Sequence, residues 1–287
     1  MTKRSKIPKP IKFHGGKWYL QGVIRQLAHP HRIRVFGCAG GWSEGWNWPN
    51  DDAVGEIIND VDGWLINFYE VLVNLKQCKE LLRRLHLTPF SESQWRKSTD
   101  VVLATIKPSI DPVSAAYHYF MHMRLSMAGR GDSFAPATSC RLRNNMLEQV
   151  SAYLGAIEGL PQAAVRLCKV MIRNIGVAQL LKTMDKPGVW FYLDPTYHPD
   201  TRVSKNVYRH EMTTEQHEEM LDVLGKLKHA KFLLSGYDCT LYRRKKKQYG
   251  FKQVTIGRPN ASSTKKEKDE KMESFWANYD LPRLQSS

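Results

Sequence analysis

Residues 189–193, Val189-Trp190-Phe191-Tyr192-Leu193, restrict the fold of this chain more than any other stretch. Five consecutive apolar or aromatic residues predict a strand buried on both faces, as in a sheet with helices on each side. The next four, Asp194-Pro195-Thr196-Tyr197, then stand at the carboxyl end of that strand, where open α/β sheets bind ligands. We therefore predict an α/β fold with a ligand site here. The alternative is a plain turn, because Asp and Pro both favour turns.

The tetrapeptide at 194–197 suits a reaction at the exocyclic amine of a planar base such as adenine. The lone pair of that amine is spread into the ring, and acceptors for its two hydrogens favour the pyramidal geometry that frees the pair. Asp194 offers one acceptor, the main-chain carbonyl of Pro195 offers the other, and the ring of Tyr197 can stack on the base. We therefore predict Asp194, Pro195 and Tyr197 as the catalytic residues.

Two further strand ends carry candidate cofactor loops. Residues 33–36 predict a short strand followed by the glycine-rich segment 36–41, and residues 54–58 predict a second strand that ends in Asn59-Asp60. Neither the segment 36–41 nor Gly15-Gly16-Lys17 matches the glycine pattern of a dinucleotide or triphosphate site. A cofactor without phosphates, such as S-adenosylmethionine, fits better, and Asp60 can accept hydrogen bonds from ribose hydroxyls.

The order of these motifs along the chain resembles one family. Lys12-Phe13-His14-Gly15-Gly16-Lys17, the segment 36–41, Asn59-Asp60 and Asp194-Pro195-Thr196-Tyr197 resemble the Dam-type DNA adenine N6-methyltransferases over nearly all 287 residues. The resemblance implies a Rossmann-like class I methyltransferase sheet with helices on both faces and an inserted, mainly helical target-recognition region. It also implies methyl transfer from S-adenosylmethionine to N6 of an adenine flipped out of double-stranded DNA, without a metal.

The same resemblance implies the residues of the cofactor site. These are Phe13, Gly15, Gly16, Lys17, Phe36, Gly37, Gly40, Asp60 and Asp194. The chain departs from the family at Arg34, Val35 and Cys38, where the family has an acid, a proline and a glycine. Thr196 stands in place of a second proline. The departures at Arg34, Val35 and Cys38 are expected to affect the affinity for the cofactor. The departure at Thr196 leaves both proposed acceptors, on Asp194 and Pro195, in place.

The predicted organisation is a catalytic domain split by an insertion: residues 1–75 and 188–287 form the catalytic domain, and residues 76–187 form the helical target-recognition region. Several elements of the catalytic domain follow from local patterns. We predict a helix after Asp62 with apolar positions at Leu65, Phe68, Tyr69, Leu72 and Leu75, and a second helix that begins at the capping box Thr213/Gln216. Strands are predicted over 231–235, 251–256 and 275–279. A lysine-rich mobile loop is predicted over 258–273.

The net charge of +15 is concentrated in two places. Residues 1–12 hold five basic residues and no acid, and residues 241–271 have a balance of +8. Such clusters favour a phosphate backbone, although a charge run can also be an ordinary solvated surface. We predict as DNA contacts Arg124, Arg130, Arg141, Arg143, Arg243, Arg244, Lys245, Lys246 and Lys247.

Other features exclude alternative classes of protein. The chain has no run of 18 apolar residues, and its five widely spaced cysteines are expected to be free thiols in a reducing compartment. We expect a monomer or weak dimer in the cytoplasm of a bacterial or phage-infected cell, with no membrane partner. Two rival functions stay open: methyl transfer to another planar amine, in cytosine, RNA adenine or protein glutamine, and DNA binding by a methyltransferase-like protein that has lost catalysis.

Overall fold

The computed structural model describes residues 6–48, 55–136, 140–201, 208–259 and 270–284. The chain forms two compact units. The helical unit comprises Met1–Gln21, Gly40–Pro49 and Asp62–Asn174, and the sheet unit comprises Gly22–Ala39, Asn50–Val61 and Ile175–Ser287. These units are defined by contacts and not by role, so the catalytic and target-recognition boundaries predicted from the sequence stay predictions.

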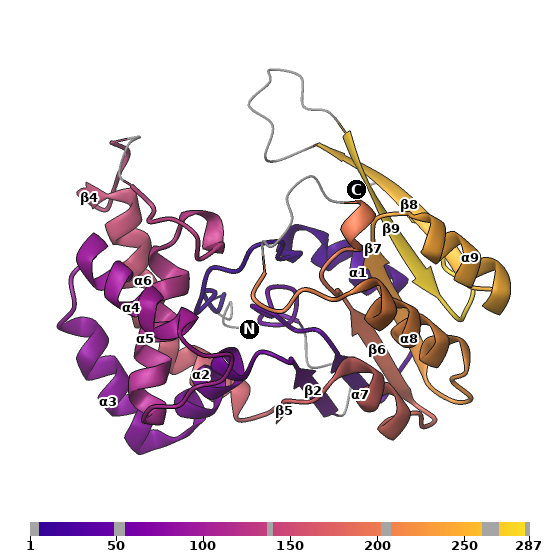
Figure 1. Cartoon of the computed structure of the whole chain (residues 1–287), viewed down its shortest axis with the longest axis horizontal. Helices are drawn as coiled ribbons and strands as arrows, with labels where there is room; N and C mark the ends of the chain where they lie inside the picture. The colour runs from indigo at the N-terminus through magenta and orange to yellow at the C-terminus, as the bar shows by residue number, and fades with distance from the viewer. Residues whose placement is uncertain (1–5, 49–54, 137–139, 202–207, 260–269, 285–287) are drawn as a thin grey trace, which may run out of the picture. The chain divides into compact units, whose positions relative to one another are not determined.

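A mostly parallel seven-stranded sheet has the order β5-β2-β1-β6-β7-β9-β8 (Figure 1). The strands are β1 (Ile33–Phe36), β2 (Gly55–Asn59), β5 (Met171–Arg173), β6 (Val189–Leu193), β7 (Lys231–Gly236), β8 (Lys252–Pro259) and β9 (Glu270–Ala277). Strand β1 pairs in parallel with β2 and β6, and β6 pairs in parallel with β7. Strand β9 is antiparallel to both β7 and β8. This α/β arrangement is compatible with the predicted Rossmann-like fold.

Helices cover the sheet unit because alternate strand residues are apolar. Val35, Phe191 and Phe232 share one face by register and are buried in the same core. That core includes side chains from α7 (Val177–Thr183), α8 (Thr214–Gly225) and α9 (Thr240–Tyr249). On the other face Trp190 donates to the hydroxyl of Tyr279, which in turn donates to the carbonyl of Leu27 at the end of α1 (Gln21–Leu27).

Two local patterns formed as predicted. All five residues of β6 are buried, which confirms the doubly covered strand at 189–193. Helix α8 begins with the reciprocal capping box of Thr213 and Gln216, and its apolar positions, from His217 to Leu224, face the interior. In both cases the signal is local, so neighbouring residues were sufficient to specify it.

The last two strands are longer than predicted. The ladder of β8 and β9 runs from Lys252 paired with Ala277 to Pro259 paired with Glu270, so residues 258–259 and 270–273 are strand. The prediction of a loop over 258–273 was therefore wrong at its ends, and residues 260–269 lie outside the described residues. An antiparallel ladder satisfies backbone groups whatever the side chains, which is why a polar segment can extend a strand.

The helical unit contains several of the helices in the described part of the chain. They are α2 (Gly63–Val73), α3 (Leu75–His86), α4 (Glu92–Leu103), α5 (Pro112–Leu125) and α6 (Glu148–Leu167), with a separate hairpin of β3 (Leu142–Arg143) and β4 (Met146–Leu147). The short 3-10 turns are η1 (Trp18–Leu20) and η2 (Met127–Gly129) here, and η3 (Pro199–Thr201) in the sheet unit. No helix in the described part of the chain has the length and apolar character needed to cross a bilayer.

One predicted helix was too long. Helix α2 ends at Val73 because Asn74 adopts an extended conformation, and the Asn74 side chain then caps α3 by accepting from Gln77 N. Leu75 therefore opens a new helix and is exposed, so the sequence prediction that it continues the buried stripe of α2 was wrong. An Asn can end one helix and cap the next, and apolar spacing alone does not reveal this.

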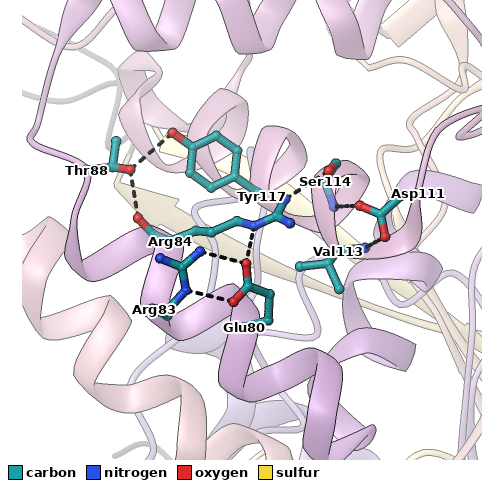
Figure 2. Close-up of polar contacts among 8 residues, drawn as sticks. All are labelled: Glu80, Arg83, Arg84, Thr88, Asp111, Val113, Ser114 and Tyr117. Atoms are coloured by element: carbon teal, nitrogen blue, oxygen red, sulfur yellow. Dashed lines mark hydrogen bonds and ion pairs between the residues drawn. The ribbon is translucent and has the colours of Figure 1, made fainter.

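Polar side chains join α3 to α5 in Figure 2. Glu80 accepts hydrogen bonds from Arg83 and Arg84, and Arg84 also donates to the hydroxyl of Ser114 on α5 at 2.9 Å. The hydroxyls of Thr88 and Tyr117 lie 3.1 Å apart. These contacts fix one edge of the helical unit through charged and hydroxyl groups, outside its apolar core.

Candidate functional site at the carboxyl ends of the parallel strands

The candidate site lies where the sheet order reverses, between β1 and β6. Ligands of doubly wound sheets bind outside the carboxyl ends of strands at such a reversal. Phe36 ends β1, and the amide of the following Gly37 donates to the carbonyl of Tyr192 on β6 at 3.0 Å. The glycine-rich segment after β1 is therefore hydrogen-bonded to the strand that leads into Asp194.

Asn59 connects the ends of β1 and β2. The buried side-chain amide of Asn59 donates to the carbonyls of Gly37 and Ile175, both at 2.9 Å. The main-chain carbonyl of Asn59 accepts from the amide of Ala39 at 2.9 Å. The sequence indicated Asn59-Asp60 as a strand end but gave Asn59 no role of its own. We assign it here as the residue that fixes the loop after β1 against the loop after β2.

Gly37 is favoured by packing. A Cβ atom at this position would lie 2.3 Å from Cδ2 of the buried Leu193, so that side chain would have to shift. Glycine therefore leaves room for Leu193 at the point where β1 and β6 both end. The glycine that the resemblance assigned to the cofactor has a structural role that requires no ligand.

Two carboxylates from different strand ends raise the pKa of one thiol, that of Cys38. Burial raises the pKa of Cys38 well above its ordinary value, and the negative charges of Asp60, after β2, and Asp194, after β6, raise it further. The structure thus brings together Asp60 and Asp194, two of the residues predicted for the cofactor site. A half-buried thiol that stays neutral near the charges of two carboxylates leaves the local charge negative, and this environment favours a cationic ligand.

Residues 194–198, hereafter the lip, have no helix or strand of their own but are held by side chains from several other elements. Ser235 on β7 donates to Oδ1 of Asp194 at 2.9 Å, and the Thr196 hydroxyl accepts from the amide of Met212 at 2.9 Å. His198 is buried, and its Nε2 lies 3.2 Å from the hydroxyl of Thr214 on α8. The lip is therefore more than a turn that follows a core strand.

Tyr197 is fixed at both its hydroxyl and its ring. The hydroxyl donates to Oε1 of Glu273 on β9 at 2.6 Å, and the ring centroid lies 4.3 Å from that of Tyr237, directly after β7. Burial raises the pKa of the Tyr197 phenol well above its ordinary range, and the charges of Asp194 and Glu273 raise it further. The phenol therefore stays neutral and keeps its proton to donate. No sequence signal pointed to Glu273.

The N-terminal box lies in the helical unit, where its residues pack on the segment that begins at Gly40. Cβ atoms at Gly40 and Gly41 would meet Phe13 at 2.9 and 2.6 Å, and one at Gly16 would meet Oγ of Ser43 at 2.8 Å. Gly15 has a left-handed backbone, and Lys17 is buried. Phe13, Gly16 and Gly40 are thus brought together within this unit, and close packing accounts for the glycines.

The predicted basic contacts of the helical unit differ in exposure. Arg130, Arg141 and Arg143 are exposed, the last of these on β3 of the hairpin. Arg124 is instead only partly exposed; its guanidinium donates to the carbonyl of Ala152, and burial lowers its pKa to about 10. Arg124 is therefore engaged in a hydrogen bond within the unit, whereas the other three are exposed.

The basic stretch 243–247 on α9 is largely paired with acids or amides of the sheet unit. Arg243 contacts Asp238 and Arg244 contacts Glu218, each at 2.8 Å. Lys245 is buried and pairs with both Glu218 and Asp222, and Lys246 donates to Gln253. Lys247 is exposed. The free positive charge of this helix is thus smaller than its sequence suggests.

Comparison with known proteins adds no further assignment. No protein-family model matches the chain, and no curated protein matches its sequence.

All five cysteines are free thiols, as predicted. Within the described residues, no group of three or more His, Cys, Asp or Glu side chains is arranged to hold a metal ion.

Proposed function

We propose that this protein is an S-adenosylmethionine-dependent DNA methyltransferase that modifies N6 of an adenine flipped out of the duplex. The observation that carries the proposal is the convergence of Asp60 and Asp194 on Cys38, at the strand ends where the sheet order reverses. Counted along the chain, the first five sheet strands have the order 3-2-1-4-5 of doubly wound nucleotide-binding folds. The antiparallel pair β9 and β8 completes the sheet.

The charge at these strand ends fits the proposed cofactor. When bound, S-adenosylmethionine supplies a sulfonium methyl group, which is electrophilic and positively charged. Asp60 can accept hydrogen bonds from ribose hydroxyls, and the two carboxylates beside a neutral Cys38 thiol favour a cation over an anion. A phosphate-containing cofactor would meet repulsion from the same two charges.

The lip provides the acceptors that the target amine needs. Asp194 and the Pro195 carbonyl can accept its two hydrogens, and the bond from Ser235 fixes the Asp194 carboxylate in one orientation. Asp194 does not have to be a strong base, because the amine becomes acidic only after it is methylated. Its role is orientation and electrostatic stabilisation in a site that excludes water.

Two departures from the family pattern have structural explanations. Arg34 is fully buried in the sheet, where it pairs with Glu56 on β2 at 3.2 Å and donates to His31 at 3.1 Å. Thr196 provides the acceptor for the Met212 amide, which a proline side chain would not offer. These contacts give both substituted residues structural roles that leave the proposed acceptors on Asp194 and Pro195 in place.

The test is transfer of a labelled methyl group from S-adenosylmethionine to unmethylated DNA, followed by digestion and identification of the labelled nucleoside. We expect N6-methyl-2′-deoxyadenosine. Label in another base would replace adenine as the target, and absence of transfer would overturn the proposal. Calorimetric titration with S-adenosylmethionine then separates a lapsed enzyme, which binds no cofactor, from one whose substrate is not DNA.

A further inference from the structure

Glu273 is an acidic side chain in an unusual place. It is 4% exposed on β9, and its carboxylate accepts the Tyr197 hydroxyl at 2.6 Å. Distances of 2.5–2.7 Å are typical of hydroxyl-to-carboxylate hydrogen bonds, which are roughly twice as strong as neutral ones. A carboxylate is costly to bury without such a partner, so the pair fixes both side chains in one arrangement.

The position of Glu273 is set by the sheet and not by the lip. Its backbone pairs with Ile256 within the long ladder of β8 and β9, so Glu273 is anchored independently of residues 194–198. Tyr197 belongs to a segment without regular backbone hydrogen bonding, so the direction of its ring depends on side-chain contacts. Two such contacts are described, the bond to Glu273 and the ring contact with Tyr237.

We propose that Glu273 is a positioning residue: it holds the ring of Tyr197 in the orientation in which that ring stacks on the target base. This inference rests on the proposed function and names the part of the lip that receives the base. Asp194 and Pro195 define where the amine lies, and Glu273, acting through Tyr197, defines the plane of the base. Aromatic stacking depends strongly on that plane.

The neutral state of Tyr197 makes this arrangement robust. Because burial and the nearby carboxylates raise the pKa of the phenol, Tyr197 remains a donor throughout the range in which methyl transfer would be measured. A Glu-to-Gln change keeps an acceptor of the same size but removes the charge that strengthens the bond. Tyr-to-Phe removes the same bond from the other partner and keeps the ring.

The test compares Glu273→Gln, Tyr197→Phe and the double variant with the wild type, using unmethylated plasmid DNA and tritiated S-adenosylmethionine. Glu219→Gln is the matched control, because Glu219 forms an exposed ion pair with Lys182 in the same unit. We expect each single variant to lower kcat roughly tenfold, as for loss of a hydrogen bond to a charged group, with little change in KM for the cofactor. The double variant should be no worse than either single one, because both remove one bond.

A second readout does not require activity. With 3-fluorotyrosine at residue 197, we expect Glu273→Gln to shift the fluorine resonance in the free protein and Glu219→Gln to leave it unchanged. If the wild type methylates DNA and Glu273→Gln retains full kcat, or if the two single effects add, the positioning role is overturned and the proposed function stands. If the wild type transfers no methyl group, both the positioning role and the proposed function are overturned, even if the fluorine shift confirms the contact between Glu273 and Tyr197.

Discussion

The lip at 194–198 and the basic stretch at 243–247 both belong to the sheet unit and are both rich in polar groups, but they are held differently. In the lip, bonds from β7, β9 and the start of α8 orient side chains at the end of a buried strand. In the basic stretch, acids from α8 bind the cations and reduce their free charge. The same kind of contact orients side chains in the lip and neutralises charge in the basic stretch.

The difference shows that a partner's position decides what a polar residue contributes. Asp194 lies at the carboxyl end of β6, and the hydrogen bond from Ser235 orients its carboxylate. Lys245 is 4% exposed and lies against Glu218 and Asp222, so it contributes to the stability of the fold. Mutations in the two regions should therefore affect different measurements.

The largest expected effect is on catalysis at the lip. Asp194→Ala should lower kcat for methyl transfer by about 100-fold or more, comparable to the loss of an oxyanion-hole donor, and should change cofactor affinity much less. Steady-state kinetics on unmethylated DNA and calorimetry with S-adenosylmethionine measure the two effects. Turnover equal to that of the wild type would contradict a catalytic role for the lip, and the lip would then not differ in function from the basic stretch.

The next effect is on stability at the basic stretch. Lys245→Met should lower the free energy of unfolding by about 2 kcal/mol, because it removes the buried cation that both Glu218 and Asp222 contact. Lys247→Met, two residues away and exposed, is the matched control and should stay within about 0.5 kcal/mol of wild type. Urea unfolding measures both, and equal losses would show that Lys245 is no more structural than its exposed neighbour.

A smaller effect is expected from the hydroxyl of Thr196. Thr196→Val keeps the shape of the side chain but removes the acceptor of the Met212 amide, so it should cost about 1 kcal/mol in the free energy of unfolding. It should also lower kcat less than Asp194→Ala does. A neutral effect on both quantities would mean that this contact does not hold the lip.

The smallest effect is a pH dependence. The bond from Lys245 lowers the pKa of Asp222 below its ordinary 3.8, so the unfolded chain binds more protons in acid. This contribution is complete above pH 3.8 and is lost as the pH falls through the folded pKa. The stability difference between wild type and Lys245→Met should therefore narrow as the pH falls from 5 to 3 (roughly the range of carboxyl titration). A constant difference would assign the effect of Lys245 to packing alone.

Sequence signals succeeded where they were local. The buried run of β6, the short strand β1 and the capping box of α8 follow from adjacent residues, and so does the position of Asp194 at a strand end. The contacts that define the candidate site were out of reach, because Glu273 lies 76 residues from Tyr197 and Ser235 lies 41 residues from Asp194. Two acids that pair with α9 were missed for the same reason, because Glu218 lies 26 residues from Arg244 and Asp222 lies 23 residues from Lys245.

Alkylation of Cys38 shows whether the ends of β1, β2 and β6 form one cofactor site around this thiol. The wild-type protein is treated with iodoacetamide at alkaline pH, with and without S-adenosylmethionine, and each cysteine is followed by mass spectrometry. Exposed Cys140 is the internal control. With S-adenosylmethionine at ten times Kd, we expect about tenfold slower alkylation of Cys38 and no change at Cys140. Equal rates for Cys38 with and without the cofactor would contradict it.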